Sequence, residues 1–258
     1  MMLHLLSQTK GGVGKSTISN HILPSLTGSS LIIEIDNNNV SSIYSSSSKI
    51  RGVTLKTDKK SIEQAIVEAE LNSLDSNIII DAGGGDDSLK VIEALMAAKL
   101  ECTVWLPITP DAEALTNLQH IVQKVGKTYP INLVFSRFSK LKEDYYFIFG
   151  DETQSANLQF LAPFANILQV PIKNIFSKAK QRATTVWDLA TIFGDKDPQM
   201  LKKEWQNEYA NATDKVAAKE LYMQKRAVMW LQDEAQEYLG AVKNSFQSTK
   251  DFIKTIQS

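Results

Sequence analysis

The chain has 258 residues and a formal net charge of −1, from 28 Lys and Arg against 29 Asp and Glu. This balance excludes a protein whose whole surface binds nucleic acid, so any such binding must be local. The single cysteine, Cys102, excludes an internal disulfide and fits a reducing cytosol, and no apolar run reaches the roughly 18 residues of a membrane span. No basic and apolar leader precedes the first strand, so we expect a cytoplasmic protein.

In chain order, apolar strand-like runs alternate with helical patterns. The sequence predicts an open, mostly parallel sheet with helices on both faces, which is a three-layer, Rossmann-like α/β fold. The segment 41–48 holds six serines and predicts a mobile surface loop. Strands are expected at Leu3–Leu6, Leu31–Ile35, Ile78–Ile80, Cys102–Leu106 and Ile131–Phe135, and helices at Ser16–Leu26, Ser61–Leu74, Asp87–Leu100 and Asp111–Val125.

Between the first strand and the first helix lies the octapeptide KGGVGKST, residues 10–17. Glycines let backbone N–H groups wrap phosphates, a lysine binds the β- and γ-phosphates, and a hydroxyl binds Mg²⁺. The N-terminus of the following helix adds partial positive charge. The strand, loop and helix together favour a phosphate-binding loop over a glycine-rich turn without a ligand.

This octapeptide resembles the deviant Walker A box of the ParA/MinD family of P-loop ATPases, whose members position plasmids and other cargo. The resemblance implies weak, dimer-dependent hydrolysis of ATP with Mg²⁺, in which Lys10 reaches across a homodimer to the partner's phosphates. It also implies that Ser16 binds Mg²⁺ and that Thr17 touches the α-phosphate. The nucleotide-binding residues it implies here are Gly11, Gly12, Val13, Gly14, Lys15, Ser16 and Thr17.

Two acidic residues follow predicted strands, at the edge of the sheet where ligands bind in such folds. Asp81 is the candidate Walker B acid for Mg²⁺, although it could instead cap the next turn. Asp36 resembles the family's water-activating aspartate, with Glu34 in place of the preceding aspartate and Asn37–Asn39 in place of the usual continuation. The alternative for Asp36 is a turn residue without a catalytic role. The glycines at 83–85 resemble the family's second switch, and Gly85 is expected near the γ-phosphate.

The base-binding region is less clearly marked. Many family members carry an asparagine for adenine where Ser136 falls, so the base contact is open. The resemblance places a late strand before Pro171, whose loop is expected to close over adenine, and a helix over Ser177–Ile192.

Four basic residues and no acid occur from 169 to 187. On a two-fold dimer they would provide eight positive charges for salt-sensitive contacts with DNA phosphates, unless they form an ordinary solvated helix face. These candidate DNA-binding residues are Lys173, Lys178, Lys180 and Arg182.

Aromatic residues among balanced charges from about residue 195 predict long, largely exposed helices. We therefore divide the chain into an ATPase domain, 1–194, and a helical C-terminal extension, 195–258, packed on the domain or on a dimer partner. Apolar residues from Leu239 to Ile256 could form a membrane-binding helix like that of MinD, but Gly240 interrupts it and its positive charge is modest.

The favoured function is a ParA-like ATPase that dimerises on ATP, binds DNA non-specifically and partitions plasmid or other cargo when a ParB-like centromere-binding or adaptor protein stimulates hydrolysis. One alternative is a MinD-like ATPase that cycles on membranes. Another is an accessory ATPase of conjugation or plasmid maintenance that acts through protein partners. Relatives that share an iron–sulfur cluster between subunits are disfavoured, because Cys102 lies alone in a predicted strand.

Overall fold

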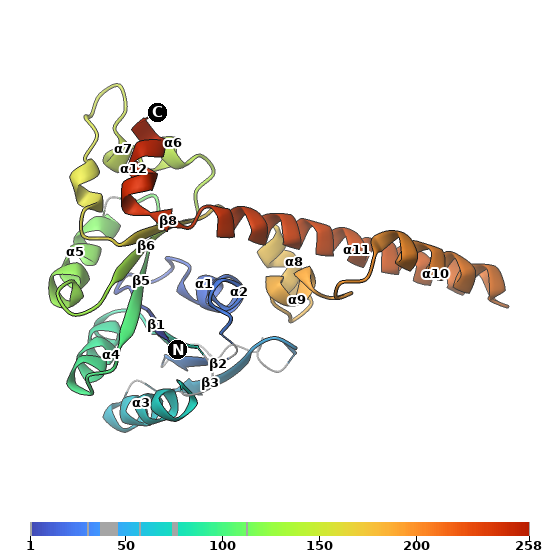
Figure 1. Ribbon diagram of the computed structural model, residues 1–258, viewed down its shortest axis with the longest axis horizontal. Coiled ribbons are helices and arrows are strands. Elements are labelled where there is room, and N and C mark those ends of the chain that lie inside the picture. Colours follow the sequence, from blue (N-terminus) through green and yellow to red (C-terminus); the bar gives the residue numbers. More distant parts are fainter. Residues whose placement is uncertain are drawn as a thin grey trace.

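A computed structural model describes residues 2–29, 31–36, 46–56, 58–73, 77–111 and 113–257. Within these residues, eight strands form one sheet in the order β3-β2-β4-β1-β5-β6-β7-β8, and every neighbouring pair is parallel except β7 with β8. This confirms the predicted fold class (Figure 1). The strands are β1 (Leu3–Leu6), β2 (Leu31–Ile35), β3 (Arg51–Leu55), β4 (Ile78–Ala82), β5 (Cys102–Ile108), β6 (Ile131–Ser136), β7 (Asn166–Val170) and β8 (Gln247–Ser248).

The central strands are continuous apolar runs because helices cover both of their faces. Every residue of β1, β2, β4, β5 and β6 is buried. Cys102 is among them, and burial raises the pKa of its thiol to about 12, as expected of a core residue. The register pairs Leu6 with Asp81 and Glu34 with Asp81, so the carboxyl ends of β1, β2 and β4 meet at one edge.

Two hydrophobic clusters lie on opposite faces of the sheet. One cluster receives side chains from α3, α4, α5 and α12, and the other from α1, α2, α8, α9 and α11. The helices are α1 (Lys15–His21), α2 (Leu23–Thr27), α3 (Lys59–Ser73), α4 (Asp86–Ala97), α5 (Glu113–Val125), α6 (Leu141–Asp144), α7 (Tyr146–Phe149), the 3-10 helix η2 (Leu158–Leu161), α8 (Ile175–Gln181), α9 (Val186–Ala190), α10 (Pro198–Asn211), α11 (Lys215–Asn244) and α12 (Thr249–Gln257).

Two of the predicted helices are each split in the structure. The helix expected over 16–26 breaks at Ile22, because Pro24 has no backbone N–H and starts a new helix, α2. The helix expected over 177–192 breaks where Ala183 adopts a left-handed φ of 50°. Thr185 then starts α9 through a capping box with Asp188. The serine-rich loop prediction falls on 41–45, outside the described residues, and on 46–48.

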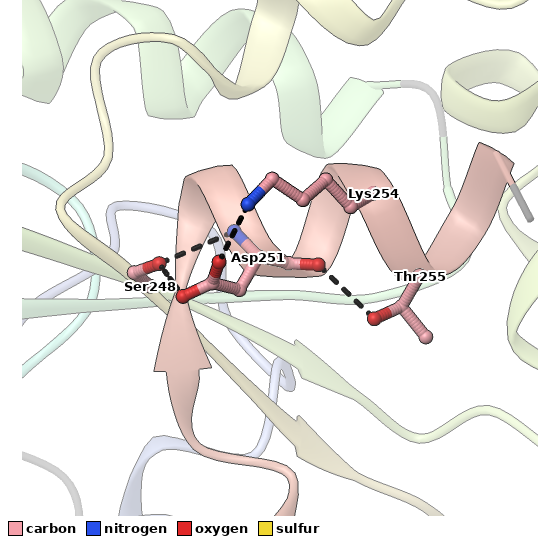
Figure 2. Close-up of polar contacts among 4 residues, drawn as sticks. All are labelled: Ser248, Asp251, Lys254 and Thr255. Carbon is pink, nitrogen blue, oxygen red and sulfur yellow. Dashed lines mark hydrogen bonds and ion pairs between the residues drawn. The ribbon is translucent and has the colours of Figure 1, made fainter.

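The segment from Leu239 to Ile256, considered in the sequence as one amphipathic helix, is divided between two helices in the structure. Gly240 lies inside α11, and the chain then adds β8 to the sheet before α12 begins. Ser248 caps α12: its hydroxyl donates to Asp251 Oδ2 over 2.6 Å and accepts from the Asp251 N–H, as Figure 2 shows. Phe252 and Val242 are buried in the core, so these two apolar side chains of the segment pack on the sheet, whereas Phe246 is partly exposed.

The first half of α11 and all of α10 extend away from the sheet as a helical hairpin (Figure 1). A small cluster holds the two helices together, with Leu201 and Trp205 of α10 against Met229 of α11. The second half of α11 packs on α8, α9 and β7. None of the described helices is long and apolar enough to span a membrane. The division of the chain at residues 194 and 195 stays a prediction.

Candidate functional site

The loop 10–17 connects β1 to α1 at the carboxyl edge of the sheet. Gly12 and Gly14 have φ angles of 74° and 89°, which L residues with side chains rarely adopt. Gly14 is the N-cap of α1 and provides no side-chain cap, while the buried side chain of Val13 anchors the loop below. Gly14 therefore leaves the first N–H groups of α1 without a side-chain cap. Such N–H groups at the N-terminus of a helix can bind an anion.

Lys15 and Asp81 face one another at the base of this loop. The Lys15 ammonium donates to the Gln8 carbonyl over 3.0 Å. Burial lowers the pKa of Lys15, while the charges of Asp81 and Asp36 act in the opposite direction. The ammonium thus lies at the base of the loop, within the electrostatic influence of two carboxylates.

Asp81 is only 3% exposed, and burial raises its pKa to about 6. Hydrogen bonds from Ser19 and Ser16 and the charge of Lys15 oppose this shift, and the charge of Glu34 adds to it. The Ser19 hydroxyl donates to Asp81 Oδ2 over 2.6 Å. A buried carboxylate beside a serine hydroxyl can bind Mg²⁺, and the ion would remove the cost of ionising it.

The donor set fits a magnesium ion that arrives with a nucleotide. Among the described residues, no group of three His, Cys, Asp or Glu side chains could hold a metal by itself. Ser16 and Asp81 supply two oxygen donors, and Mg²⁺ is usually bound by one or two carboxylates together with phosphates and water. The site is therefore incomplete without phosphate.

Asp36 directly follows β2 at the same edge, half-buried, and its N–H donates to the Leu55 carbonyl over 3.1 Å. Gly83 lies against it, since a Cβ on Gly83 would approach the Ile35 carbonyl to 3.0 Å and Asp36 Cγ to 3.7 Å. Gly85 donates its N–H to the Thr9 carbonyl over 2.7 Å, which ties the 83–85 turn to the loop. The structure thus brings the predicted switch, Asp36 and the loop together. The Asn37–Asn39 prediction lies outside the described residues.

Lys10, predicted to act across a dimer, forms an ion pair with Asp111 of its own chain. Asp111 follows β5 and lies 101 positions away in sequence. This partner was not predicted, because only the fold brings the two residues together.

Ser136 falls where many family members carry an asparagine for adenine, and in the structure its hydroxyl is bonded within the protein. Its buried hydroxyl lies 2.9 Å from the carbonyls of Val13 and Ile108, and Tyr145 bonds to its backbone. The next residue, Arg137, is exposed, has a left-handed φ of 58°, and places Nε 3.7 Å from where a Cβ on Gly14 would lie. Its position directly after β6, at the ligand-binding edge, was the signal in the sequence that could have identified it.

Pro171 follows β7 at this same edge. The neighbouring Ile172 N–H donates to the Phe138 carbonyl over 2.9 Å, and the Tyr238 hydroxyl donates to the Pro171 carbonyl over 2.8 Å. The loops after β6 and β7 are therefore bonded to one another and to α11. Of these two loops, the one after β6 lies beside Gly14 through Ser136 and Arg137.

Three of the four predicted DNA-binding cations are exposed on or beside α8, namely Lys173, Lys180 and Arg182. Lys178 differs from them, because its ammonium lies 2.5 Å from Glu234 Oε2 on α11. The sequence from 169 to 187 contains no acidic residue. It therefore did not indicate this carboxylate, which belongs to a helix distant in the sequence.

No protein-family profile and no curated protein matches the chain. It is similar to the structure of an ATP complex of an aspartate-to-alanine variant of Cyanothece McdA, at 15% identity and a TM-score of 0.51, over 73% of this chain and 90% of that chain. It is also similar to the cell division protein MinD of Aquifex aeolicus, at 12% identity and a TM-score of 0.49, over 71% of this chain and 87% of that one. The McdA likeness shows that the two chains share a fold.

Proposed function

We propose that this chain is a ParA/MinD-type ATPase that binds ATP and Mg²⁺ at the loop 10–17 and hydrolyses the terminal phosphate slowly as a homodimer. The observation that carries the proposal is the convergence of a left-handed glycine loop, the half-buried Lys15 and the carboxylates of Asp81 and Asp36 at one edge of the sheet. The ATP complex of the McdA variant, which has the same fold, supports ATP as the nucleotide.

Each residue then has a role that its position permits. Backbone N–H groups from Gly11 to Lys15 and the Lys15 ammonium hold the β- and γ-phosphates, while Ser16 and Asp81 hold the magnesium ion. Thr17 touches the α-phosphate and Gly85 approaches the γ-phosphate. Asp36 orients the attacking water, and Arg137 and Pro171 bound the base.

Dimerisation follows from the role of Lys10. To reach the phosphates of a second subunit, its ammonium must leave Asp111, so the ion pair holds Lys10 back in the monomer. A Lys10→Ala variant should bind ATP but lose dimer-dependent turnover. An Asp111→Ala variant keeps Lys10 and releases it, and should therefore turn over ATP at least as fast as the wild type. Wild-type turnover in Lys10→Ala would refute action across the dimer.

Asp36 is assigned to the hydrolytic step. The Asp36→Ala variant should bind ATP and accumulate as an ATP-bound dimer, because binding does not need this carboxylate but water activation does. Light scattering and phosphate release together measure this outcome. Normal phosphate release by the variant would remove Asp36 from the mechanism.

The proposed output is non-specific DNA binding in the ATP dimer, which would let the protein partition plasmid or other cargo. A ParB-like partner bound to the cargo would stimulate hydrolysis and release the dimer. The exposed Lys173, Lys180 and Arg182 support this choice, since paired subunits would present them twice. Because the C-terminal segment packs into the sheet, the MinD-like membrane cycle has less support. An ATPase that acts through protein partners alone remains the second candidate, since the α10–α11 hairpin exposes apolar side chains.

A gel-retardation assay with random duplex DNA tests the DNA proposal. With MgATP the wild type should retard DNA in a salt-sensitive way, and Lys180→Glu with Arg182→Glu should abolish the shift. The matched control is Lys178→Glu with Glu234→Lys, which exchanges a pair that is already neutral and should leave the shift nearly unchanged. Retardation that survives the first double substitution would contradict this surface and favour the protein-only alternative.

A further inference from the structure

Three large apolar side chains lie exposed along one line of α11. Val216, Met223 and Trp230 are 72%, 62% and 60% exposed. They are spaced seven residues apart, so they fall within about 40° of one another around the helix axis. Ala227 lies four residues after Met223 and three residues before Trp230, which is the alternating spacing of a coiled-coil heptad. We call these four residues the α11 stripe.

The stripe lies on a part of α11 that projects beyond the sheet (Figure 1). The neighbouring helix, α10, packs on a different side of α11, through Leu201 and Trp205 against Met229. Large apolar side chains repeated at heptad spacing, on a helix face that no other described helix covers, form the kind of seam along which two helices pair.

Two charged residues flank the centre of the stripe. Glu220 and Arg226 lie three positions before and three positions after Met223. Among the described residues neither forms an ion pair, whereas the nearby Lys225 pairs with Glu208 of α10. The Arg226 guanidinium lies over the Trp230 ring at 5.4 Å, and its Nε is buried without a hydrogen-bond partner.

We propose that the α11 stripe binds the same stripe of a second copy of this chain, with the two helices antiparallel and a two-fold axis at Met223. In this arrangement Val216 packs against Trp230 of the second copy, a small side chain against a large one, at both ends of the contact. Glu220 meets Arg226 of the second copy twice, so the unpaired charges become complementary.

A parallel arrangement would place equal residues opposite one another. Two Trp230 rings would then meet at one layer and two Val216 side chains at another, and Glu220 would face Glu220. The sequence is complementary to itself only when the second helix is reversed, which is the arrangement that an antiparallel two-fold pair requires.

This contact is separate from the ATP-dependent dimer. The loop 10–17 lies at the carboxyl edge of the sheet, whereas the stripe lies on the projecting half of α11 (Figure 1). The α11 dimer should therefore form without nucleotide and survive Lys15→Gln. When ATP is added, chains joined through both contacts should form species larger than dimers.

Sedimentation of the full-length chain without nucleotide tests the proposal. The wild type should show a concentration-dependent equilibrium between monomer and dimer. Glu220→Arg places an arginine opposite Arg226 of the second copy at both ends of the contact. This repulsion should raise the dissociation constant about tenfold or more. Combining Glu220→Arg with Arg226→Glu restores opposite charges and should return the dissociation constant close to that of the wild type.

Lys203→Glu is the control, because Lys203 lies on the exposed face of α10 and should not alter the equilibrium. The three variants change exposed or half-buried side chains, and circular dichroism verifies that each is folded. A wild type that stays monomeric at every concentration would overturn the proposal, and so would a charge-swapped variant that stays as weak as Glu220→Arg. A dimer that appears only with ATP would assign self-association to the nucleotide site instead.

Discussion

Asp81→Asn should stabilise the folded chain in the absence of nucleotide while abolishing its response to magnesium. Burial raises the pKa of Asp81 from 3.8 to about 6, so above pH 6 the folded state carries the full cost of an ionised buried carboxylate. A difference of about 2 pKa units corresponds to about 3 kcal/mol. The hydrogen bond from Ser19 becomes weaker with a neutral acceptor, at a cost of about 1 kcal/mol. The net gain expected at pH 7 is therefore about 2 kcal/mol.

The sign of the pH dependence follows from the same shift. Between pH 3.8 and 6 the folded chain holds a proton that the unfolded chain has lost, so the stability of the wild type falls as the pH rises through this range. The advantage of Asp81→Asn should therefore be largest at pH 7 and nearly absent at pH 4.

Thermal unfolding at both pH values measures this effect, and for a domain of this size about 2 kcal/mol is a rise in Tm of roughly 4–8 °C. MgATP should raise the Tm of the wild type and leave that of the variant almost unchanged. A variant less stable than the wild type at pH 7 would refute the reasoning, since it would show that the carboxylate is already compensated by its neighbours.

Three other substitutions test particular features of the fold. Asp188→Asn should destabilise the fold, in contrast to Asp81→Asn, and lower the free energy of unfolding at pH 7 by about 2 kcal/mol. Burial alone would raise the pKa of Asp188, but hydrogen bonds from two serines and a threonine outweigh it and lower this pKa to about 2. This contribution is complete above pH 3.8 and lost as the pH falls through 2, so chemical denaturation at pH 7 and pH 3 should show a shrinking difference. Tyr145→Phe removes the hydroxyl that accepts from the buried Ser136 N–H, and should cost about 1–3 kcal/mol by chemical denaturation; an unchanged midpoint would contradict that bond. Gly14→Ala should weaken nucleotide binding in a filter assay because φ is 89°, whereas Gly11→Ala, with no atom within 4 Å of an added Cβ, should bind almost normally; equal binding by both would contradict the loop geometry.

The predictable part of the fold was the part with strong local patterns. Runs such as Ile78–Ile80 predicted central strands, and KGGVGKST predicted a loop between β1 and a helix. The break at Pro24 had a signal in the sequence, since proline cannot continue a helix without losing a hydrogen bond. The strand β8 had none, because Gln247 and Ser248 are two polar residues whose pairing depends on β7 lying beside them.

The residue types of the candidate site could be predicted, but their pairings could not. Asp81 was expected at the edge of the sheet, yet its bond with Ser19 joins residues 62 positions apart. The Lys10–Asp111 and Lys178–Glu234 ion pairs span 101 and 56 positions and change which charges are available. Such contacts arise from packing between helices and loops, which the spacing of motifs does not report.

Titration calorimetry of the purified chain with ATP and Mg²⁺ tests the central claim most directly. We expect saturable binding of one nucleotide per chain that requires Mg²⁺ and disappears in Lys15→Gln, whose circular dichroism should match that of the wild type. Absence of heat with the wild type, or equal binding by Lys15→Gln, would contradict a nucleotide site at residues 10–17.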